Sequence, residues 1–571
     1  MRELSVGPKY RLRAIGGLHV VTLAWDTLDG TIPSDPLLLG FAIERAELDD
    51  GAEVVERYWM RGIKRFRHKD EGTAPGSPVP TSEHPIQAFQ WGDYTAKPDT
   101  TYRYRLVPAI GKPKLLSLDF DNATEVTIRT EAEIGEMTPG EVRHDIFFNR
   151  GAAGSQAYAR RFGKTRPDPD DPHSEQMRWL SRGLFEALTG FIGVAAGADA
   201  ADYALRGMLY EFRYAPVGEA LRVAAAQGAD VAIHYEAQTY REENEAMISA
   251  VGIENVCKAQ KVREGIRHNK FLVLLRHGSP IAVWTGSTNI SAGGIFGHSN
   301  VGHVVWDQVI AQVFLDYWDE LSVPTVTTGK LRKFAVETEP TPAAGTLPPR
   351  DRVLTLFSPR DPYDPDSSSP TLSWYADLLG EAQKIACMTF AFNFDPVFQN
   401  VVSGAHDSLT YLVFDKALQE LEDSEIRANG NTIIAAGAKL DSGDLENFLG
   451  EVLTGFNRNR YIHDKFLLVD PLGEDPIVVT GTANFSEPSQ EKNDENMLVI
   501  RGDRRVADIY FGEFMRIFDH LYARYIVDLI RKRGASDPSA GFLKEERGEW
   551  LPAQFGTGYK SKRRKAFLAG D

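Results

Sequence analysis

The sequence predicts an α/β protein in which two pseudo-symmetric α/β/α lobes share one active site and follow a β-sandwich domain. Three observations lead to this fold class: an internal repeat, strand and helix patterns that alternate within each repeat, and short strand-like segments ahead of them. At 571 residues the chain is longer than one ordinary domain. We therefore expect several domains.

The repeat is clearest around two His-x-Lys elements. The first reads HNKFLVLL from His268, and the second reads HDKFLLVD from His463. Gly286 follows the first histidine by 18 residues, and Gly481 follows the second by the same 18 residues. An asparagine follows three residues later in each case. Two matching spacings with matching residue types indicate a duplication.

The similarity extends upstream. Residues 204–217 align with 384–397 at an offset of 180, which places Met208 over Met388, and the alternating apolar residues predict a strand in both segments. Helical periodicity and further strand patterns follow, as in an α/β lobe. The predicted helices are 217–227, 309–321 and 506–521, and a predicted strand is 230–235. The predicted parts are 1–132 (sandwich), 140–335 (first lobe), 336–350 (linker) and 351–571 (second lobe with a C-terminal extension).

The first part contains short alternating segments without a helical period, which favours a β-sandwich. Its strands are predicted at 20–25, 40–46, 88–91 and 101–109, with an insertion around 52–84. The segment PDTTYRY (98–104) resembles the tyrosine corner of fibronectin type III domains. That resemblance implies a domain that braces the rest of the chain or binds a protein partner rather than one that catalyses.

Composition narrows the protein class. The net charge of −16 disfavours broad adhesion to polyphosphates or anionic membranes. No apolar run is long enough to span a membrane and no secretory signal is recognisable, so a cytoplasmic protein is expected. Cys257 and Cys387 are expected to be buried thiols. The basic cluster 560–565 has two interpretations: a solvated tail or a phosphate- or lipid-facing patch.

The chemistry follows from the paired motifs. On a strand, a histidine and a lysine two residues apart lie on one face, and the following Gly-Ser/Thr and Asn add a hydroxyl and an amide. All these groups can donate hydrogen bonds to phosphate oxygens, and two such sets would surround one phosphodiester. One imidazole can attack phosphorus while the other protonates the leaving oxygen. The candidates are His268, Lys270, Ser287, Asn289, His463, Lys465, Thr482 and Asn484.

A metal site is the rival interpretation. Asp470 with His463, or the separate His277, His298 and His303, could be ligands. The intervening lysines would repel a cation, however, and no His-x-x-x-His pair accompanies the motifs. We expect neither a metal ion nor a cofactor.

The paired elements resemble those of the phospholipase D superfamily, over residues from about 140 to the end. The second element matches the His-x-Lys-x4-Asp pattern through His463, Lys465 and Asp470. In the first, Leu275 replaces the aspartate, as in tyrosyl-DNA phosphodiesterases, which also lack it. The resemblance implies a phosphodiesterase with a covalent phosphohistidine, in which that aspartate is supportive. With two motifs in one chain, no dimer is needed for catalysis.

The resemblance also implies roles. In the family, an acidic or amide residue some 30 positions after each histidine orients the histidine of the opposite lobe. The matching positions here are Glu495 for His268 and Asn300 for His463. Because a carboxylate fixes the tautomer of an imidazole and stabilises the charge it gains, we expect His268 to be the nucleophile and His463 the general acid.

The substrate is less well defined by the sequence. Phospholipid hydrolysis or headgroup transfer is the first interpretation. A nuclease or DNA-repair phosphodiesterase is the alternative, because four arginines precede the motifs and could follow a phosphate backbone: Arg263, Arg267, Arg458 and Arg460. A third possibility is a binding protein built on an eroded enzyme scaffold.

Overall fold

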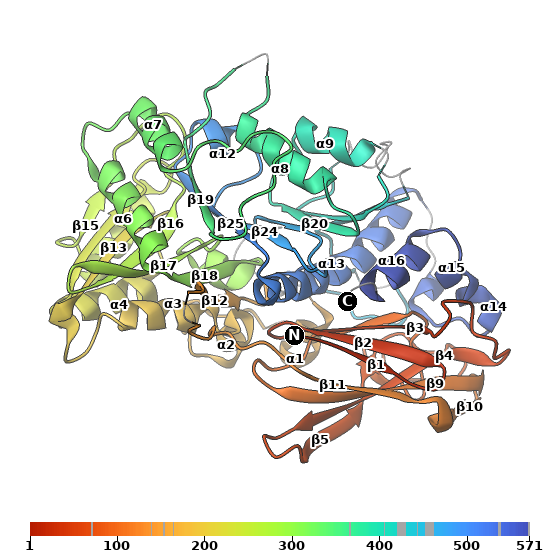
Figure 1. Ribbon diagram of the computed structural model, residues 1–571. Coiled ribbons are helices and arrows are strands. Elements are labelled where there is room, and N and C mark those ends of the chain that lie inside the picture. The colour runs from red at the N-terminus through yellow and green to blue at the C-terminus, as the bar shows by residue number, and fades with distance from the viewer. Residues whose placement is uncertain are drawn as a thin grey trace.

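The computed structural model has an N-terminal pair of β-sheets followed by two α/β lobes (Figure 1). This agrees with the predicted fold class. The described residues are 1–69, 72–138, 140–151, 155–163, 165–364, 367–404, 406–418, 430–441, 444–451, 462–534 and 538–568.

Two packed antiparallel sheets form the N-terminal part. One has the order β1-β2-β3-β8, and the other has the order β10-β9-β4-β5 with β11 on β9. The Tyr102 hydroxyl accepts a hydrogen bond from the Lys97 backbone at 2.9 Å, as a tyrosine corner would. The fibronectin type III resemblance itself stays a prediction. The strands are β1 Arg2–Val6, β2 Tyr10–Gly16, β3 Val21–Thr27, β4 Leu38–Leu48, β5 Val54–Trp59, β6 Arg61–Gly62, β7 Val79–Pro80, β8 Gln90–Asp93, β9 Thr101–Lys112, β10 Leu115–Leu118 and β11 Thr124–Arg129.

Each lobe is built on a seven-stranded mixed sheet, and the two sheets have the same strand order. Lobe one follows β12-β18-β17-β16-β13-β14-β15, and lobe two follows β19-β25-β24-β23-β20-β21-β22. Lobe one contains β12 Arg143–Phe148, β13 Tyr203–Leu209, β14 Asp230–Tyr235, β15 Cys257–Ala259, β16 Lys270–Arg276, β17 Ser279–Gly286 and β18 Val301–Trp306. Lobe two contains β19 Leu354–Ser358, β20 Ile385–Phe390, β21 Leu409–Phe414, β22 Thr432–Ala436, β23 Phe466–Val469, β24 Ile477–Gly481 and β25 Glu495–Arg501.

The strand register corrects the upstream alignment by one residue. Met208 pairs with Phe271, but Met388 pairs with Leu467 rather than with Phe466, the counterpart of Phe271. Because side chains alternate across a strand, a shift of one residue moves a side chain to the other face. Met208 accordingly lies in the core between the lobes, and Met388 lies in the outer core of lobe two. The true offset in this strand is 181.

Helices cover both sheets. In lobe one they are α1 Gln156–Phe162, α2 Glu175–Ser181, α3 Leu184–Gly193, α4 Ala215–Ala226, α5 Arg241–Val251, α6 Gln308–Ser322 and α7 Thr328–Thr338. After β19 they are α8 Pro370–Gly380, α9 Pro396–Ser403, α12 Glu487–Glu491, α13 Arg504–Lys532, α14 Arg547–Trp550, α15 Pro552–Phe555 and α16 Tyr559–Leu568. Within the described residues, no helix combines the length and apolar character needed to cross a membrane.

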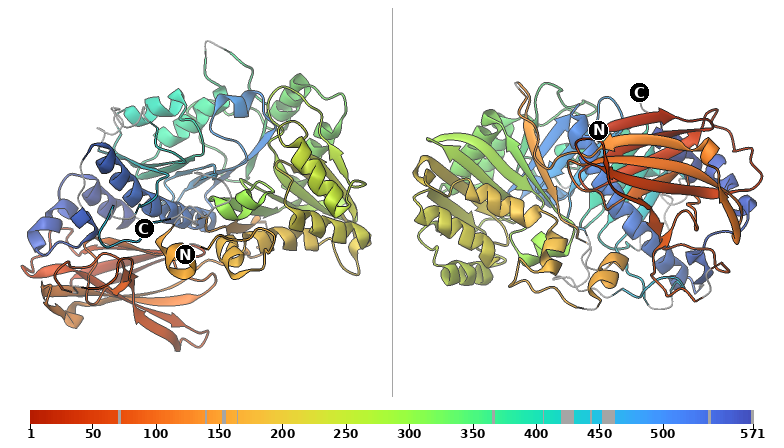
Figure 2. Two further views of the ribbon diagram at one scale, coloured as in Figure 1. Left: turned by 180° about the vertical axis from the view of Figure 1, so that it is seen from behind. Right: turned by 90° about the horizontal axis from the view of Figure 1, so that it is seen from below.

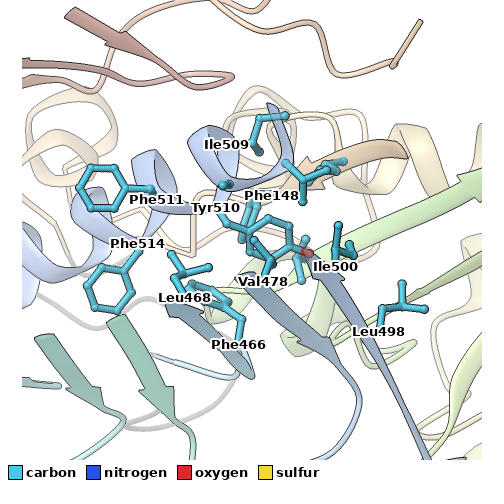
Figure 3. Packing of buried hydrophobic residues seen from close by; sticks show 14 of the residues in the cluster. Phe148, Phe466, Leu468, Val478, Leu498, Ile500, Ile509, Tyr510, Phe511 and Phe514 are labelled. Atoms are coloured by element: carbon cyan, nitrogen blue, oxygen red, sulfur yellow. The ribbon is translucent and has the colours of Figure 1, made fainter. Parts of the chain in front are cut away.

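The core between the lobes is centred on α13. Its first turns are buried on almost every side, which is typical of a helix enclosed by protein. Figure 3 shows Tyr510 and Phe514 of α13 over Phe466 of β23, with Phe148 of lobe one beside them. A substantial apolar interface therefore holds the two motif strands in a fixed relation.

The N-terminal sheets pack against lobe two through α13 and α16 (Figures 1 and 2). The basic cluster 560–565 lies in α16 at this contact. Arg564 is buried, pairs with Asp26 of β3 and lies 4.0 Å from the Phe555 ring, and Arg563 bonds to Asp519. Both interpretations of the cluster are therefore wrong for these two arginines: Arg564 joins α16 to the N-terminal sheets, and Arg563 joins α16 to α13.

Candidate active site

The two motif histidines meet where the lobes join. The rings of His268 and His463 are buried and their centroids lie 6.5 Å apart. The backbone N–H of His268 donates to the Asp494 carbonyl at 3.1 Å, and that of His463 donates to the Ser299 carbonyl at 3.1 Å. The backbone of the opposite lobe thus holds each histidine. The acceptor for His268 lies just before β25, and the acceptor for His463 lies just before β18.

The Nδ1 partners fix the tautomer of both rings. His268 Nδ1 lies 2.8 Å from a Glu495 carboxylate oxygen. His463 Nδ1 lies 3.0 Å from the Ser287 carbonyl and 3.0 Å from Asn300 Oδ1. A carboxylate and a carbonyl can only accept, so Nδ1 carries the proton in both rings and Nε2 keeps its lone pair. Glu495 and Asn300 stand where the resemblance placed them.

The lysines complete a buried cationic centre. Lys270 and Lys465 each donate from Nζ to the carbonyl of their own motif histidine. The Lys270 ammonium also lies 4.8 Å from the centre of the Tyr210 ring, which in turn packs against His268 at 4.6 Å. Burial lowers the pKa of Lys270 to about 7, although Glu495 and Glu211 oppose this. Sequence reasoning missed Tyr210.

The same burial acts on the imidazoles. It lowers the pKa of His268 to about 4, against the opposing effect of Glu495. It lowers the pKa of His463 well below the usual range, with Lys465 and His298 as further causes. The ring of His298 lies 4.8 Å from that of His463. Without a bound anion, both catalytic candidates are therefore neutral near pH 7 and His463 lacks the proton of a general acid.

The motif amides and hydroxyls divide into two groups. The Oδ1 atoms of Asn289 and Asn484 have no hydrogen-bond partner in the described part of the chain. The Ser287 hydroxyl instead donates to Asn300 at 2.8 Å, and the Thr482 hydroxyl contacts the Asn496 backbone at 2.9 Å. The hydroxyls thus hold the segments that carry Asn300 and Glu495, and the two asparagine oxygens have acceptor capacity left for a hydrogen-bond donor.

Asp470 lies away from the histidines, at the far end of β23. Five residues of extended chain separate it from Lys465, or roughly 16 Å. Its carboxylate accepts hydrogen bonds from the backbone of Gln383, Lys384 and Ile385 at 2.7–3.0 Å. Leu275, its counterpart in lobe one, is buried in the core between the lobes. This carboxylate holds a turn, which explains why one lobe can lack it.

The middle residues of the motifs bind across the lobe interface. The side-chain oxygen Oδ1 of Asn269 accepts from the Asn496 Nδ2 group at 2.8 Å, and Asn496 Oδ1 in turn accepts from the Thr285 hydroxyl. Asp464, the counterpart of Asn269, lies 3.4 Å from the Ser287 hydroxyl, and burial raises its pKa to about 6. These contacts were not foreseen, because a motif position between two functional residues carries no signal of its own.

Two of the four arginines are structural. Arg263 and Arg267 are almost fully buried and pair with Asp494 at 2.7 and 3.2 Å. A guanidinium that is neutralised and shielded in this way does not follow an external phosphate backbone, so that interpretation of the pair is wrong. Arg458 and Arg460 lie outside the described residues.

A cavity of about 290 Å³ opens beside Lys465 and Asn484. Its walls come from the loop after β20, from the segment after β24 that contains α12, and from Ile266 of lobe one. Within the described residues, no group of three His, Cys, Asp or Glu side chains could hold a metal ion. The expectation of metal-free chemistry stays a prediction.

Comparisons with known proteins address the family. Residues 383–520 match the family described as "Cardiolipin synthase, PLD-like domain". The second lobe contains a PLD-like domain. Because lobe one has the same strand order and an equivalent motif, the two lobes share this fold. No curated protein sequence matches the chain.

Solved structures with similarity include phosphatidylserine synthase from Haemophilus influenzae Rd KW20, at 12% identity and TM-score 0.42, covering 62% of this chain and 91% of that one. The yeast tyrosyl-DNA phosphodiesterase has 12% identity and TM-score 0.31, covering 56% and 88%. The phospholipase D family member NUC from Salmonella typhimurium has 17% identity and TM-score 0.20, covering 30% and 95%.

Proposed function

We propose that the protein is a phosphodiesterase that forms a covalent phosphohistidine on His268 and acts on phospholipids without a metal ion. The observation that carries the proposal is the pair of buried imidazoles from opposite lobes, both with Nδ1 held by an acceptor and with a lysine beside each. Such a constellation combines two nitrogen lone pairs with fixed positive charge, which suits phosphoryl transfer.

The first step uses the lone pair on His268 Nε2. It attacks phosphorus, a P–N bond forms, and the bond to the leaving oxygen breaks while that oxygen takes a proton from His463. Burial and the two lysines oppose protonation of His463, but a bound phosphodiester anion offsets their charge and raises its pKa. The lysines and the side-chain Nδ2 groups of Asn289 and Asn484 donate hydrogen bonds to the non-bridging oxygens.

The second step reverses the roles. Neutral His463 takes a proton from water, or from an alcohol in a transfer reaction. The oxygen then attacks phosphorus and the P–N bond breaks, which returns His268 to its starting state. Glu495 stabilises the positive imidazole in the intermediate, as a carboxylate does beside a charged histidine. This difference between the rings supports His268 as the nucleophile.

Three observations favour lipid over nucleic acid. The description of the family that the second lobe matches names a lipid synthase. This property belongs to that family and supports the proposal by analogy. Arg263 and Arg267, part of the case for nucleic acid, are buried against Asp494. The net charge of −16 also gives little general attraction to a polyanion.

Turnover of fluorescent phosphatidylcholine and of single-stranded DNA, each with and without EDTA, tests the proposal. We expect lipid turnover that EDTA leaves unchanged and that the His268→Asn variant loses. DNA cleavage without lipid turnover would select the nuclease alternative. Turnover of neither would favour a binding protein on an eroded enzyme scaffold, and loss of activity in EDTA would contradict the metal-free mechanism.

A further inference from the structure

The two lobes differ in what lies beside their motif lysine. In lobe two the space next to Lys465 is the 290 Å³ cavity, and Phe392 and Ser486 line it. With the corrected strand register, the counterpart of Phe392 in lobe one is Glu211, and motif spacing makes Ser291 the counterpart of Ser486. There the Glu211 carboxylate accepts from the Ser291 hydroxyl at 2.8 Å and from Arg213 at 3.1 Å.

Lobe one thus has polar and aromatic groups where lobe two has open space. Glu211 is almost fully buried, and the Tyr210 ring packs on both Lys270 and His268. A carboxylate in this position would repel a second anion and expose no apolar surface. Any organic group attached to the phosphate is therefore better accommodated on the side of lobe two.

Apolar side chains form a large part of the lobe-two cavity's lining. Ile266, Phe390, Phe392, Phe485 and Pro488 contribute hydrocarbon surface. Phe392 is 43% exposed and Ile266 is 37% exposed, although both lie beside the active site. The Phe392 ring centroid is 6.4 Å from that of His463. Exposed apolar side chains beside a reactive centre indicate a surface that a ligand covers.

Most polar side chains around the cavity are already hydrogen-bonded within the protein. Asn493 accepts from the Ile266 backbone at 2.9 Å and donates to Glu495 at 3.4 Å. The hydroxyls of Ser486 and Ser489 contact each other at 3.4 Å, and that of Thr389 donates to the Asp464 carbonyl at 2.9 Å. Of the other polar lining residues, Lys465 and Asn484 serve the phosphate in the proposed mechanism, which leaves the exposed Asn393 to read the edge of a nucleobase or a sugar.

We infer that this cavity binds an apolar chain of the group that stays on phosphorus in the covalent intermediate, so the substrate enters in one orientation only. The cavity reaches from Phe392 near His463 to Ile266, which is two residues from His268, and so flanks the bound phosphate. The inference rests on the proposed phosphodiesterase activity and adds the specificity-determining surface to it.

The test uses p-nitrophenyl phosphodiesters whose second group is methyl, butyl or hexyl, and measures p-nitrophenol release. The aryl group leaves without needing a strong acid, so the alkyl group reports on the cavity alone. For the wild type we expect kcat/KM to rise about two- to fourfold per methylene, because each buried methylene contributes apolar transfer energy, until the cavity is filled.

Two variants locate the effect. Phe392→Asn makes the exposed wall polar and should lower the ratio of kcat/KM for the hexyl ester to that for the methyl ester, which flattens the dependence on chain length. Ser486→Phe narrows the cavity and should move the optimum to a shorter chain. Val309→Ala is the matched control, since Val309 is an exposed apolar residue on α6 outside the site, and it should leave the dependence unchanged.

The outcomes separate the two proposals. Cleavage of the methyl ester that depends on His268 but shows no gain with chain length would overturn the cavity assignment and leave the phosphodiesterase standing. A thymidine p-nitrophenyl ester preferred over the hexyl ester would also overturn it, in favour of an aromatic ligand. No cleavage of any ester would contradict the proposed function itself.

Discussion

The two lobes have the same strand order and the same His-x-Lys spacing, yet their half-sites differ in charge and in shape. His268 of lobe one faces the Glu495 carboxylate, whereas His463 of lobe two faces the neutral Ser287 carbonyl and Asn300 amide. Lobe one surrounds its lysine with Tyr210 and Glu211, whereas lobe two leaves a cavity. The difference shows how a duplicated frame can divide one reaction: each imidazole obtains its electrostatic environment from the opposite half.

The largest expected effect separates the two histidines. His268→Asn should lower turnover by roughly 10⁴- to 10⁶-fold, because the nucleophile is lost. His463→Asn should lower it by roughly 10²- to 10⁴-fold. With an activated aryl ester, the second variant should accumulate the covalent intermediate, since its breakdown needs the base. Mass spectrometry of the trapped peptide checks the site, and a phosphoryl group on His463 would reverse the assigned roles.

Replacing the hydrogen-bond partner of His268 should lower kcat more than replacing the partner of His463. Glu495→Gln should cost roughly 10²- to 10⁴-fold in kcat, because a charged imidazole loses its carboxylate. Asn300→Ala, which removes a neutral acceptor while the Ser287 carbonyl remains, should cost about tenfold. Equal losses in the two variants would remove the distinction between the half-sites.

The pH profile sharpens that comparison. With an aryl ester, kcat/KM should rise as His268 loses its proton at about pH 4 and fall as Lys270 loses its proton at about pH 7. Glu495 raises the pKa of both groups, so Glu495→Gln should move both limbs to lower pH. An alkaline limb that does not move would show that Lys270 is not the group responsible.

Asn269 and Asp464, the middle residues of the two His-x-Lys motifs, allow a comparison of their effects on stability. Folding raises the pKa of Asp464 to about 6, so its carboxyl destabilises the protein progressively as pH rises from about 4 to 6 and stays destabilising above that. Asp464→Asn, which copies Asn269 of lobe one, should therefore stabilise by roughly 2–3 kcal/mol at pH 8 and by little at pH 4. Thermal melts at both pH values measure this, and an equal gain at both would refute the charge explanation.

The smallest expected effect is on stability and concerns Asp470, whose counterpart in lobe one is Leu275. Asp470→Asn weakens the bonds to three backbone N–H groups before and in β20, and should cost about 1–2 kcal/mol of stability with kcat unchanged. The thermal midpoint should fall by a few degrees. A large loss of kcat at a temperature where the variant is folded would return Asp470 to the catalytic site.

The sequence predicts what local patterns and repeats determine. The resemblance to the phospholipase D superfamily implied that Glu495 contacts His268, 227 positions away, and the two side chains do lie within hydrogen-bond distance. The register of β20 was off by one, since an alternating pattern such as that around Met388 fits either face until its neighbour strand is known. Arg267 and Arg564 were misjudged because their partners, Asp494 and Asp26, are distant in sequence. The cavity could not be predicted from the sequence, because three segments that are distant in the chain form its walls.

The crossed attachment of the histidines has a consequence for the chain as a whole. His268 takes both its backbone acceptor and its Nδ1 partner from residues 494–495, and His463 takes its own from residues 287–300. Two polypeptides made by cutting the chain within residues 339–353 would each contain an intact motif strand and an unsupported imidazole. Activity restored on mixing them would then report subunit docking directly, so that enzymatic complementation serves as a binding assay for the halves.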